Sequence, residues 1–422
     1  MDFEYIRAND LDRAWLNFEL DLPLEPMPDG SRNPFYVDRP GNPAARLEEY
    51  LLGSFREPPK YFFSGHRGCG KSTELRRIAV NPEILRKYYP IHFTIRNEAD
   101  INNLDFKDIL LAIGGQMYRE YKKRGGKLPD QLEKELESWR GTVMREVIQQ
   151  DRLAGFEVEG GLDAFFATAG LKMKLEPATR NVLRQVFESN VTGLVETINK
   201  ISIAILAKEK RTPLVLIDDL DKPDIERAKE IFHGHRETML QPNCAIVYTV
   251  SSPLFYSPEF EAIRDRAVFL PNVKLHGQAT KHIDKEGYAT MREFVHKRAN
   301  PNLIDALALD EAIRVSGGVF REMARVMRSA VQRARKSGRI EIEHAHGAEA
   351  EIRGEYRRIL NADQRALLKR VHETNRLDEP DKIAPLLQIL AVLEYANGEP
   401  WCDVHPALID LLAEEKNAIV TS

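Results

Sequence analysis

The most specific chemical pattern in the sequence is GHRGCGKS at residues 65–72, which fits G-x-x-x-x-G-K-[ST] at every fixed position. Its glycines let backbone N–H groups curl round a phosphate at a helix N-terminus. An apolar run at 61–63 precedes it and a helix-forming run follows. Lys71 is therefore expected to reach the β- and γ-phosphates of ATP, and Ser72 to offer its hydroxyl to Mg²⁺. The residues expected to contact nucleotide here are Gly65, His66, Arg67, Gly68, Cys69, Gly70, Lys71, Ser72 and Thr73.

An acidic pair supplies the partner that such a loop needs. Four apolar residues at 214–217 are followed by Asp218 and Asp219. This pattern predicts a buried parallel strand whose carboxyl end faces the ligand crevice. We expect Asp218 to hold Mg²⁺ through water. Asp219 occupies the place where many ATPases carry a glutamate that polarises the attacking water, and its side chain is one methylene shorter.

The elements that must position these residues alternate between strands and helices. Apolar runs at 61–63, 91–95, 214–217, 245–250 and 267–270 predict strands. Helical patterns at 71–80 and 106–121 lie between them, and Asp10 is expected to cap an earlier helix that runs to about residue 19. Strands separated by helices favour a mostly parallel α/β sheet.

Two regions depart from that alternation. Long helical patterns at 132–149 and 178–208, with a hairpin strand expected at 171–175, predict an insertion at about 127–212. From about 286 onward the pattern is helical, and it ends in a hairpin around 392–404 followed by a helix near 408–413. Helices followed by a hairpin are the parts of a winged-helix unit.

Composition narrows the functional classes. The chain has 422 residues, 43% of them hydrophobic, and a net charge of −4. Three distant cysteines, Cys69, Cys244 and Cys402, indicate neither a disulfide framework nor a zinc site. The H-x-H pairs at 233–235 and 344–346 lack further ligands, so zinc is not expected. Without a secretory signal or a long apolar run, we expect a cytoplasmic protein that does not enter a membrane.

Three motifs together resemble the AAA+/STAND branch of P-loop ATPases: GHRGCGKS, LVLIDDLD at 214–221 and SGGVFR at 316–321. More closely, the chain resembles prokaryotic P-loop ATPases with an IDDLDK-type acidic strand and a C-terminal winged-helix-like segment, several of which are associated with anti-phage defence. The resemblance covers most of residues 35–415 and is loose over 127–212. It implies an ASCE/AAA+-like α/β fold, in which helices flank a parallel sheet. The implied parts are a lead-in (1–34), an ATPase domain with a helical and hairpin insertion (35–275), a helical lid (276–340) and a winged-helix-like domain (341–422).

The resemblance also implies roles for individual residues. Residues 35–39, and in particular Tyr36 and Val37, are expected to form one wall of the adenine pocket; the alternative is an ordinary hydrophobic turn. Arg321 is expected to act as a sensor-2 arginine in the lid, the alternative being a solvated helix arginine. The sensor-1 group is expected among Thr249, Ser251 and Ser252, and the candidates for an arginine entering a neighbouring subunit's site are Arg264 and Arg266, unless these are plain surface arginines.

A basic segment bears on the choice of partner. Residues 321–339 contain seven Lys and Arg residues against Glu322 alone, a local charge of +6. Such a helix can contact a phosphate backbone. The alternative, which we favour, is that its arginines pair with acids elsewhere and with ATP.

The resulting hypothesis is an Mg·ATP-hydrolysing switch whose nucleotide state controls self-association or engagement of a separate effector. The first alternative is a DNA-binding ATPase loader or motor that uses the basic helix and the winged-helix-like tail. A second is a scaffold that senses ATP without turnover. A third alternative, a small-molecule or nucleotide kinase, fits less well, because the acidic strand and the Gly-Gly-x-x-Arg lid fit a switch better. The expected partners are ATP and ADP, a homo-oligomeric neighbour and an effector protein.

Overall fold

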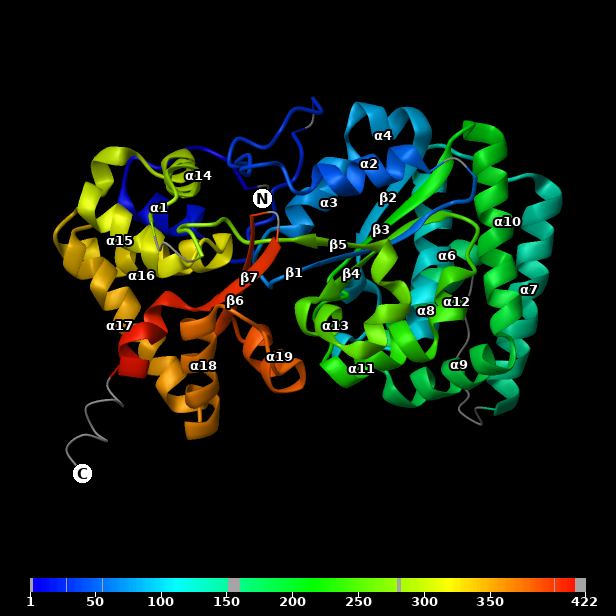
Figure 1. Cartoon of the computed structure of the whole chain (residues 1–422). Coiled ribbons are helices and arrows are strands. Elements are labelled where there is room, and N and C mark those ends of the chain that lie inside the picture. Colours follow the sequence, from blue (N-terminus) through cyan, green and yellow to red (C-terminus); the bar gives the residue numbers. More distant parts are fainter. Residues whose placement is uncertain are drawn as a thin grey trace. The chain divides into compact units, whose positions relative to one another are not determined.

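A computed structural model describes residues 3–27, 29–54, 56–150, 160–278, 282–397 and 399–413 (Figure 1). The chain forms two compact units, and each is assembled from segments far apart in the sequence. The phosphate-loop unit contains Met1–Ala45, Ser64–Arg76 and Phe269–Ser422. The sheet unit contains Arg46–Phe63 and Arg77–Val268. The fourfold division inferred from the sequence remains a prediction.

A five-stranded sheet carries the acidic pair, with strand order β2-β3-β4-β1-β5. β2 pairs with β3 in parallel, from Tyr88 opposite Thr212 to Thr94 opposite Asp218, and β3 pairs with β4 in parallel. Both β3 and β4 are almost wholly buried, which explains their continuous apolar runs. The fold is therefore the expected parallel sheet flanked by helices of a P-loop NTPase. The strands are β1 (Lys60–Gly65), β2 (Tyr88–Thr94), β3 (Thr212–Asp218), β4 (Ala245–Ser251) and β5 (Ala267–Leu270).

Helices of the sheet unit bury one large apolar core. α6 and α10 pack on each other and on β3, and nearly every residue in the first two-thirds of α6 is buried. A capping box formed by Asp105 and Asp108 fixes where α6 begins. The helices outside the insertion are α2 (Ala45–Gly53), α4 (Pro82–Lys87), α5 (Ile95–Glu98), η1 (Ile101–Asn103), α6 (Phe106–Lys123), α11 (Ile225–Lys229), η2 (Glu230–Gly234), α12 (Arg236–Leu240), α13 (Ser252–Tyr256) and η3 (Pro258–Arg266).

The insertion is helical throughout its described part, as Figure 1 shows, and two expectations about it are wrong. The hairpin strand expected at 171–175 is the end of a helix, because Phe166, Ala169 and Met173 form a buried helical face while Leu171 and Leu175 are exposed. The single helix expected at 178–208 is interrupted at Asn190, which has a non-helical φ of −136°. Residues 151–159 of the expected insertion lie outside the described residues. The helices are α7 (Asp130–Gln150), α8 (Leu162–Leu175), α9 (Pro177–Ser189) and α10 (Val191–Glu209).

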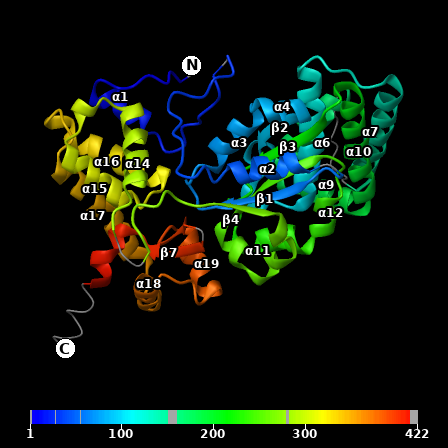
Figure 2. The ribbon, with the colours of Figure 1, turned by 45° about the horizontal axis from the view of Figure 1, so that its top comes forward.

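The phosphate-loop unit is mainly helical. The predicted first helix is confirmed: Asp10 accepts a hydrogen bond from the backbone N–H of Arg13 at its start, and α1 packs on α16 (Figure 2). The predicted hairpin is also confirmed, with Val392 opposite Val404 in antiparallel register. The elements are α1 (Leu11–Asn17), α3 (Lys71–Ala79), α14 (Lys285–Arg298), η4 (Pro301–Leu303), α15 (Ala306–Ser316), α16 (Phe320–Arg333), η5 (Ala334–Lys336), α17 (Ile342–Ile359), α18 (Ala362–Thr374), α19 (Pro380–Gln388), β6 (Val392–Asn397), β7 (Glu399–Val404) and η6 (Pro406–Leu408).

Among the described residues, none of the helices combines the length and the apolar character that crossing a membrane requires. The winged-helix identity of the C-terminal segment remains a prediction.

Gly318 gives a test of the turn that leads into α16. Its φ is +74°, and a Cβ added there would lie 1.8 Å from the carbonyl oxygen of Val273. We predict that Gly318→Ala lowers the free energy of unfolding by about 2 kcal/mol or more, because it combines left-handed strain with a backbone clash. Denaturant unfolding measures this change.

Gly354 is the matched control. It lies inside α17, and a Cβ there would meet nothing within 4 Å. Gly354→Ala should raise the free energy of unfolding by up to about 1 kcal/mol. Equal stability of Gly318→Ala and the wild type would contradict the described turn.

Candidate nucleotide-binding site

The phosphate loop links the end of β1 at Gly65 to the start of α3 at Lys71. Gly68 lies at a φ of +80°, and a Cβ there would lie 2.3 Å from Cβ of Arg321. Gly70, at +103°, lies so close to Arg39 that a Cβ would approach its guanidinium to 2.8 Å. The glycines of the pattern are therefore required both for backbone conformation and for close approach of neighbouring side chains.

Lys71 is buried in the phosphate loop. Its Nζ donates hydrogen bonds to the carbonyl oxygens of Gly65 at 2.7 Å and His66 at 3.0 Å. These bonds hold the ammonium group against the backbone of the loop. Ser72 follows it in the first turn of α3.

His66 has a role that the sequence pattern did not indicate. Its side chain is fully buried, and its Nε2 accepts a hydrogen bond from the backbone N–H of Glu394 in β6 at 2.9 Å. Burial, followed by the charge of Lys71, lowers the pKa of His66 to about 3. The imidazole is therefore neutral near pH 7, and it connects the phosphate loop to the C-terminal hairpin.

The segment 35–39 lies against the start of α3. The Tyr36 hydroxyl donates to Glu74 Oε1 at 3.2 Å, and Val37 is buried. Arg39 lies 3.8 Å from the Glu74 carboxylate, and its guanidinium lies 4.8 Å from the ring centroid of Phe320. The structure thus brings these residues beside the phosphate loop. Arg39 belongs to the predicted segment, but its contacts with Glu74 and Phe320 were not predicted.

Arg321 reaches the phosphate loop through its backbone. Its N–H donates to the carbonyl oxygen of Gly68 at 3.2 Å, while its guanidinium forms a 2.9 Å ion pair with Asp21. The first turn of α16 is thereby attached to the loop. The sensor role of the guanidinium stays a prediction.

The acidic pair occupies the carboxyl end of β3 in the sheet unit. Asp218 is buried, and its Oδ1 accepts a hydrogen bond from the backbone N–H of Asp219 at 2.9 Å. Asp219 adopts a left-handed φ of +66°. That conformation costs roughly 1–2 kcal/mol outside glycine, although Asp tolerates it better than most residues. The strain redirects the second carboxylate immediately after the strand.

Three side chains hold the Asp219 carboxylate. Thr94 donates its hydroxyl to Oδ2 at 2.8 Å, Arg96 Nε lies 3.4 Å from the same oxygen, and Lys222 Nζ lies 3.7 Å from Oδ1. Thr94 and Arg96 were missed from the sequence. Only the strand order could have indicated these two residues. Thr94 ends β2, Arg96 follows it, and β2 pairs directly with β3.

The sensor-1 candidates differ in how their hydroxyls are used. Thr249 donates to the carbonyl oxygen of Ile217 at 3.1 Å and accepts from the N–H of Leu220 at 2.9 Å, so it connects β4 to the turn at the acidic pair. Ser251 has a buried hydroxyl without a hydrogen-bond partner among the described atoms. Buried hydroxyls are normally satisfied by protein, water or ligand, which makes Ser251 the candidate with capacity left for a ligand. Ser252, also buried, begins α13.

The two arginines considered for a neighbouring subunit's site both lie in η3. Arg264 forms a 2.6 Å ion pair with Glu261 and lies over the ring of Phe255. Arg266 is close enough to Lys60 that its charge, after the larger effect of burial, lowers the pKa of that lysine. Their role in a second subunit remains a prediction.

The basic segment 321–339 is neutralised within its own unit. Each of its six arginines forms an ion pair with an acid there, which fits the alternative that we favoured from the sequence. The pairs are Arg321 with Asp21, Arg325 with Glu322 and Glu355, Arg328 with Glu19, Arg333 with Glu351, Arg335 with Asp12, and Arg339 with Asp305.

The parallel sheet and the sequence of the phosphate loop fit the P-loop NTPase fold. No family model and no curated protein matches the sequence. Among solved structures, the chain is similar to a Walker-type ATPase of Pyrococcus abyssi, with 14% identity, 93% of this chain and 99% of that chain covered, and a TM-score of 0.46. It is also similar to Cdc6p of Pyrobaculum aerophilum, with 12% identity, coverage of 91% and 98%, and a TM-score of 0.40.

A third similar structure is RuvB of Thermotoga maritima, a Holliday junction branch migration motor. It is 12% identical, with 88% of this chain and 92% of that chain covered and a TM-score of 0.35. At this level of similarity, these structures assign no role to any single residue. Each role is therefore argued from the contacts that the residue makes in this chain.

The buried imidazole of His66 predicts a pH dependence of stability. An unfolded histidine protonates near pH 6.5, whereas folded His66 stays neutral down to about pH 3. Falling pH therefore favours the unfolded state over this window, and no such effect operates above it. Between pH 7 and pH 5 the wild type should lose about 2 kcal/mol more unfolding free energy than His66→Gln.

Denaturant unfolding of both proteins at each pH measures the difference, so a constant offset caused by the substitution itself cancels. Parallel pH profiles for wild type and His66→Gln would show that His66 is not buried in the neutral form.

Proposed function

We propose that the protein binds Mg·ATP at the phosphate loop and hydrolyses it to ADP and phosphate. The observation that carries this proposal is the loop itself, in which glycines adopt positive φ angles and the Lys71 ammonium is hydrogen-bonded to the loop backbone. Opposite unit charges about 4 Å apart attract by roughly 4 kcal/mol at an effective dielectric near 20. Lys71 and the nearby Arg39 would balance much of the triphosphate's charge, and Tyr36 and Val37 would border the base.

The donor set suits Mg²⁺, which prefers oxygen ligands and retains several waters. Ser72 would offer its hydroxyl and Asp218 its buried carboxylate, the latter through water. When bound, the ion neutralises charge on the β- and γ-phosphate oxygens. The Ser251 hydroxyl, which lacks a partner among the described atoms, supports a further polar contact to phosphate or water.

Hydrolysis needs a water molecule oriented toward the γ-phosphorus. In our proposal the Asp219 carboxylate accepts a hydrogen bond from that water, while Thr94 and Arg96 keep the carboxylate in place. The water oxygen bonds to phosphorus as the bond to the β–γ bridging oxygen breaks. ADP leaves with that oxygen, and the released phosphate carries the new one.

Contacts of the phosphate loop with other elements of its unit support a switch. His66 accepts a hydrogen bond from β6, and Arg321 joins the start of α16 to Gly68. The Tyr395 hydroxyl of β6 donates to the carbonyl oxygen of Gly317 at 2.7 Å, in the turn before α16. A loop that changes shape on binding phosphate would alter these contacts, so nucleotide state would control self-association or engagement of an effector. The ion-paired arginines of 321–339 favour this over a DNA-dependent motor.

The primary test is Lys71→Ala. Removing the ammonium should reduce kcat/KM for ATP at least about 100-fold, because a charge interaction of several kcal/mol is lost. Phosphate release measures the rate. Lys134→Ala, at an exposed position in α7, is the matched control and should behave as wild type. Wild-type turnover by Lys71→Ala would refute the proposed ATPase.

Asp219→Asn separates binding from hydrolysis. The amide keeps the size of the side chain but loses its charge, so we expect ATP affinity to be retained and kcat to fall about 100-fold or more. Nucleotide titration and single-turnover assays give the two quantities. Asp224→Asn, where either residue can cap α11, is the control. An unchanged single-turnover rate in Asp219→Asn would exclude Asp219 as the water-orienting group.

A further inference from the structure

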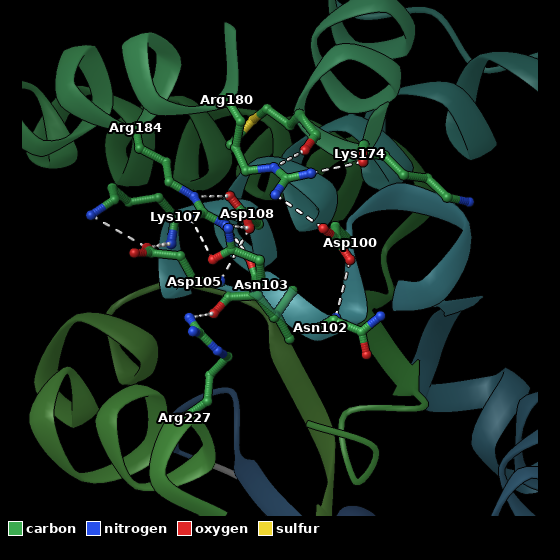
Figure 3. A network of polar contacts seen from close by, with 12 residues as sticks. Asp100, Asn102, Asn103, Asp105, Lys107, Asp108, Lys174, Arg180, Arg184 and Arg227 are labelled. Carbon is green, nitrogen blue, oxygen red and sulfur yellow. Dashed lines mark hydrogen bonds and ion pairs between the residues drawn. The ribbon is translucent and has the colours of Figure 1, made fainter. Parts of the chain in front are cut away.

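The connection between β2 and α6, residues 95–105, begins immediately after Thr94 and contains Arg96. Both residues contact Oδ2 of the Asp219 carboxylate. Because side chains on a short connection move with its backbone, whatever fixes this connection also fixes the groups that hold Asp219. The fixing contacts come from outside the connection, and Figure 3 shows them as one polar network.

Arg184 of the insertion helix α9 contacts both the connection and the first turn of α6. Its Nε donates to Asp108 Oδ1 at 3.1 Å, and its guanidinium also bonds to the carbonyl and side-chain oxygens of Asn103. The Asp108 side chain is only 2% exposed. Burial raises the pKa of Asp108 and Arg184 opposes that rise. A buried pair of this kind is costly to break, because removing one partner leaves the other charge desolvated.

Arg180, one turn earlier in α9, holds the middle of the connection. Its Nη1 lies 3.0 Å from Asp100, while Nε and Nη2 donate to the carbonyl oxygens of Met173 and Lys174 at the end of α8. The arginine therefore joins two insertion helices to the connection. Its side chain is 4% exposed, so these bonds are shielded from solvent.

A third arginine reaches the connection from the other side. Arg227 lies in α11, and its Nη1 donates to the carbonyl oxygen of Leu104 at 3.0 Å. Five residues before it, Lys222 pairs with Asp219. The connection is thus held between the insertion and the chain that follows the acidic pair. Both the connection, through Thr94 and Arg96, and the chain after the acidic pair, through Lys222, contact the Asp219 carboxylate.

We infer that Arg180 and Arg184 are positioning residues for hydrolysis: the insertion sets the catalytic geometry of Asp219 by fixing the β2–α6 connection. The inference rests on the proposed ATPase function and adds the element that regulates it. A displacement of α9 would change turnover without touching the nucleotide. If the network only stabilised the insertion, its loss would change unfolding and leave kcat intact.

The test is Arg184→Gln in the full chain, with Arg227→Gln as an independent variant at the opposite anchor. Each should lower kcat about 10- to 100-fold while KM for ATP stays within about twofold, since misplacement by about 1 Å can cost that much in rate. Arg184→Lys keeps a charge beside Asp108 but not the forked bonding, so its kcat should lie between those of Gln and wild type.

Arg145→Gln is the matched control, because the hydrogen bonds of the Arg145 side chain go to Gly141 and Thr142 of its own helix, α7. Its kcat should equal the wild-type value. Thermal unfolding of every variant confirms that comparisons are made on folded protein. If Arg184→Gln does not fold, the kcat of Arg180→Gln, the other anchor on the insertion helix α9, decides the question.

The failures of the two proposals are distinguishable. An inactive wild type, or full activity in Lys71→Ala, removes the ATPase itself. An active wild type that depends on Lys71, combined with wild-type kcat in the folded anchor variants, overturns only the positioning role. A raised KM with unchanged kcat in those variants would also overturn it, because the defect would then lie in nucleotide binding.

Discussion

The constraint on which the site depends is steric: the phosphate loop has no side chain at Gly65, Gly68 and Gly70, and its neighbours occupy the space so released. Arg321 packs on Gly68 and Arg39 lies beside Gly70. A Cβ at Gly68 would clash with the Cβ of Arg321, and one at Gly70 would displace the guanidinium of Arg39. The same glycines therefore let α16 and the segment 35–39 lie against the loop.

The sheet unit holds the adjacent carboxylates of Asp218 and Asp219 in different surroundings. Asp218 remains in strand geometry and is buried, whereas the left-handed Asp219 turns away and meets Thr94, Arg96 and Lys222. Local strain of this size persists only where surrounding contacts determine the conformation. The polar network on the β2–α6 connection supplies such contacts, and it links the insertion to the residues beside Asp219.

Local patterns predicted much of this structure. The strands, the phosphate loop and the C-terminal hairpin follow from apolar runs, glycine spacing and turn residues, all of which are properties of neighbouring residues. The hairpin strand expected at 171–175 was wrong because the alternation of Leu171, Met173 and Leu175 is that of a strand, whereas the buried residues Phe166, Ala169 and Met173 follow helical spacing. Thr94 and Arg96 were missed, and the contact of His66 with β6 was not predicted, because their partners are 125, 123 and 328 residues away in sequence.

The interleaving of the two units has a consequence for biosynthesis. Ser64–Arg76 belongs with Phe269–Ser422, and the roughly 190 residues between them form most of the other unit. At translation rates of about 5–20 residues per second, the loop emerges roughly 10–40 s before the first residues of the segment that completes its unit. During that interval the sheet unit can fold first, while Gly68 still lacks Arg321 and His66 still lacks β6. The nascent chain therefore contains the phosphate loop well before it contains the residues that contact the loop.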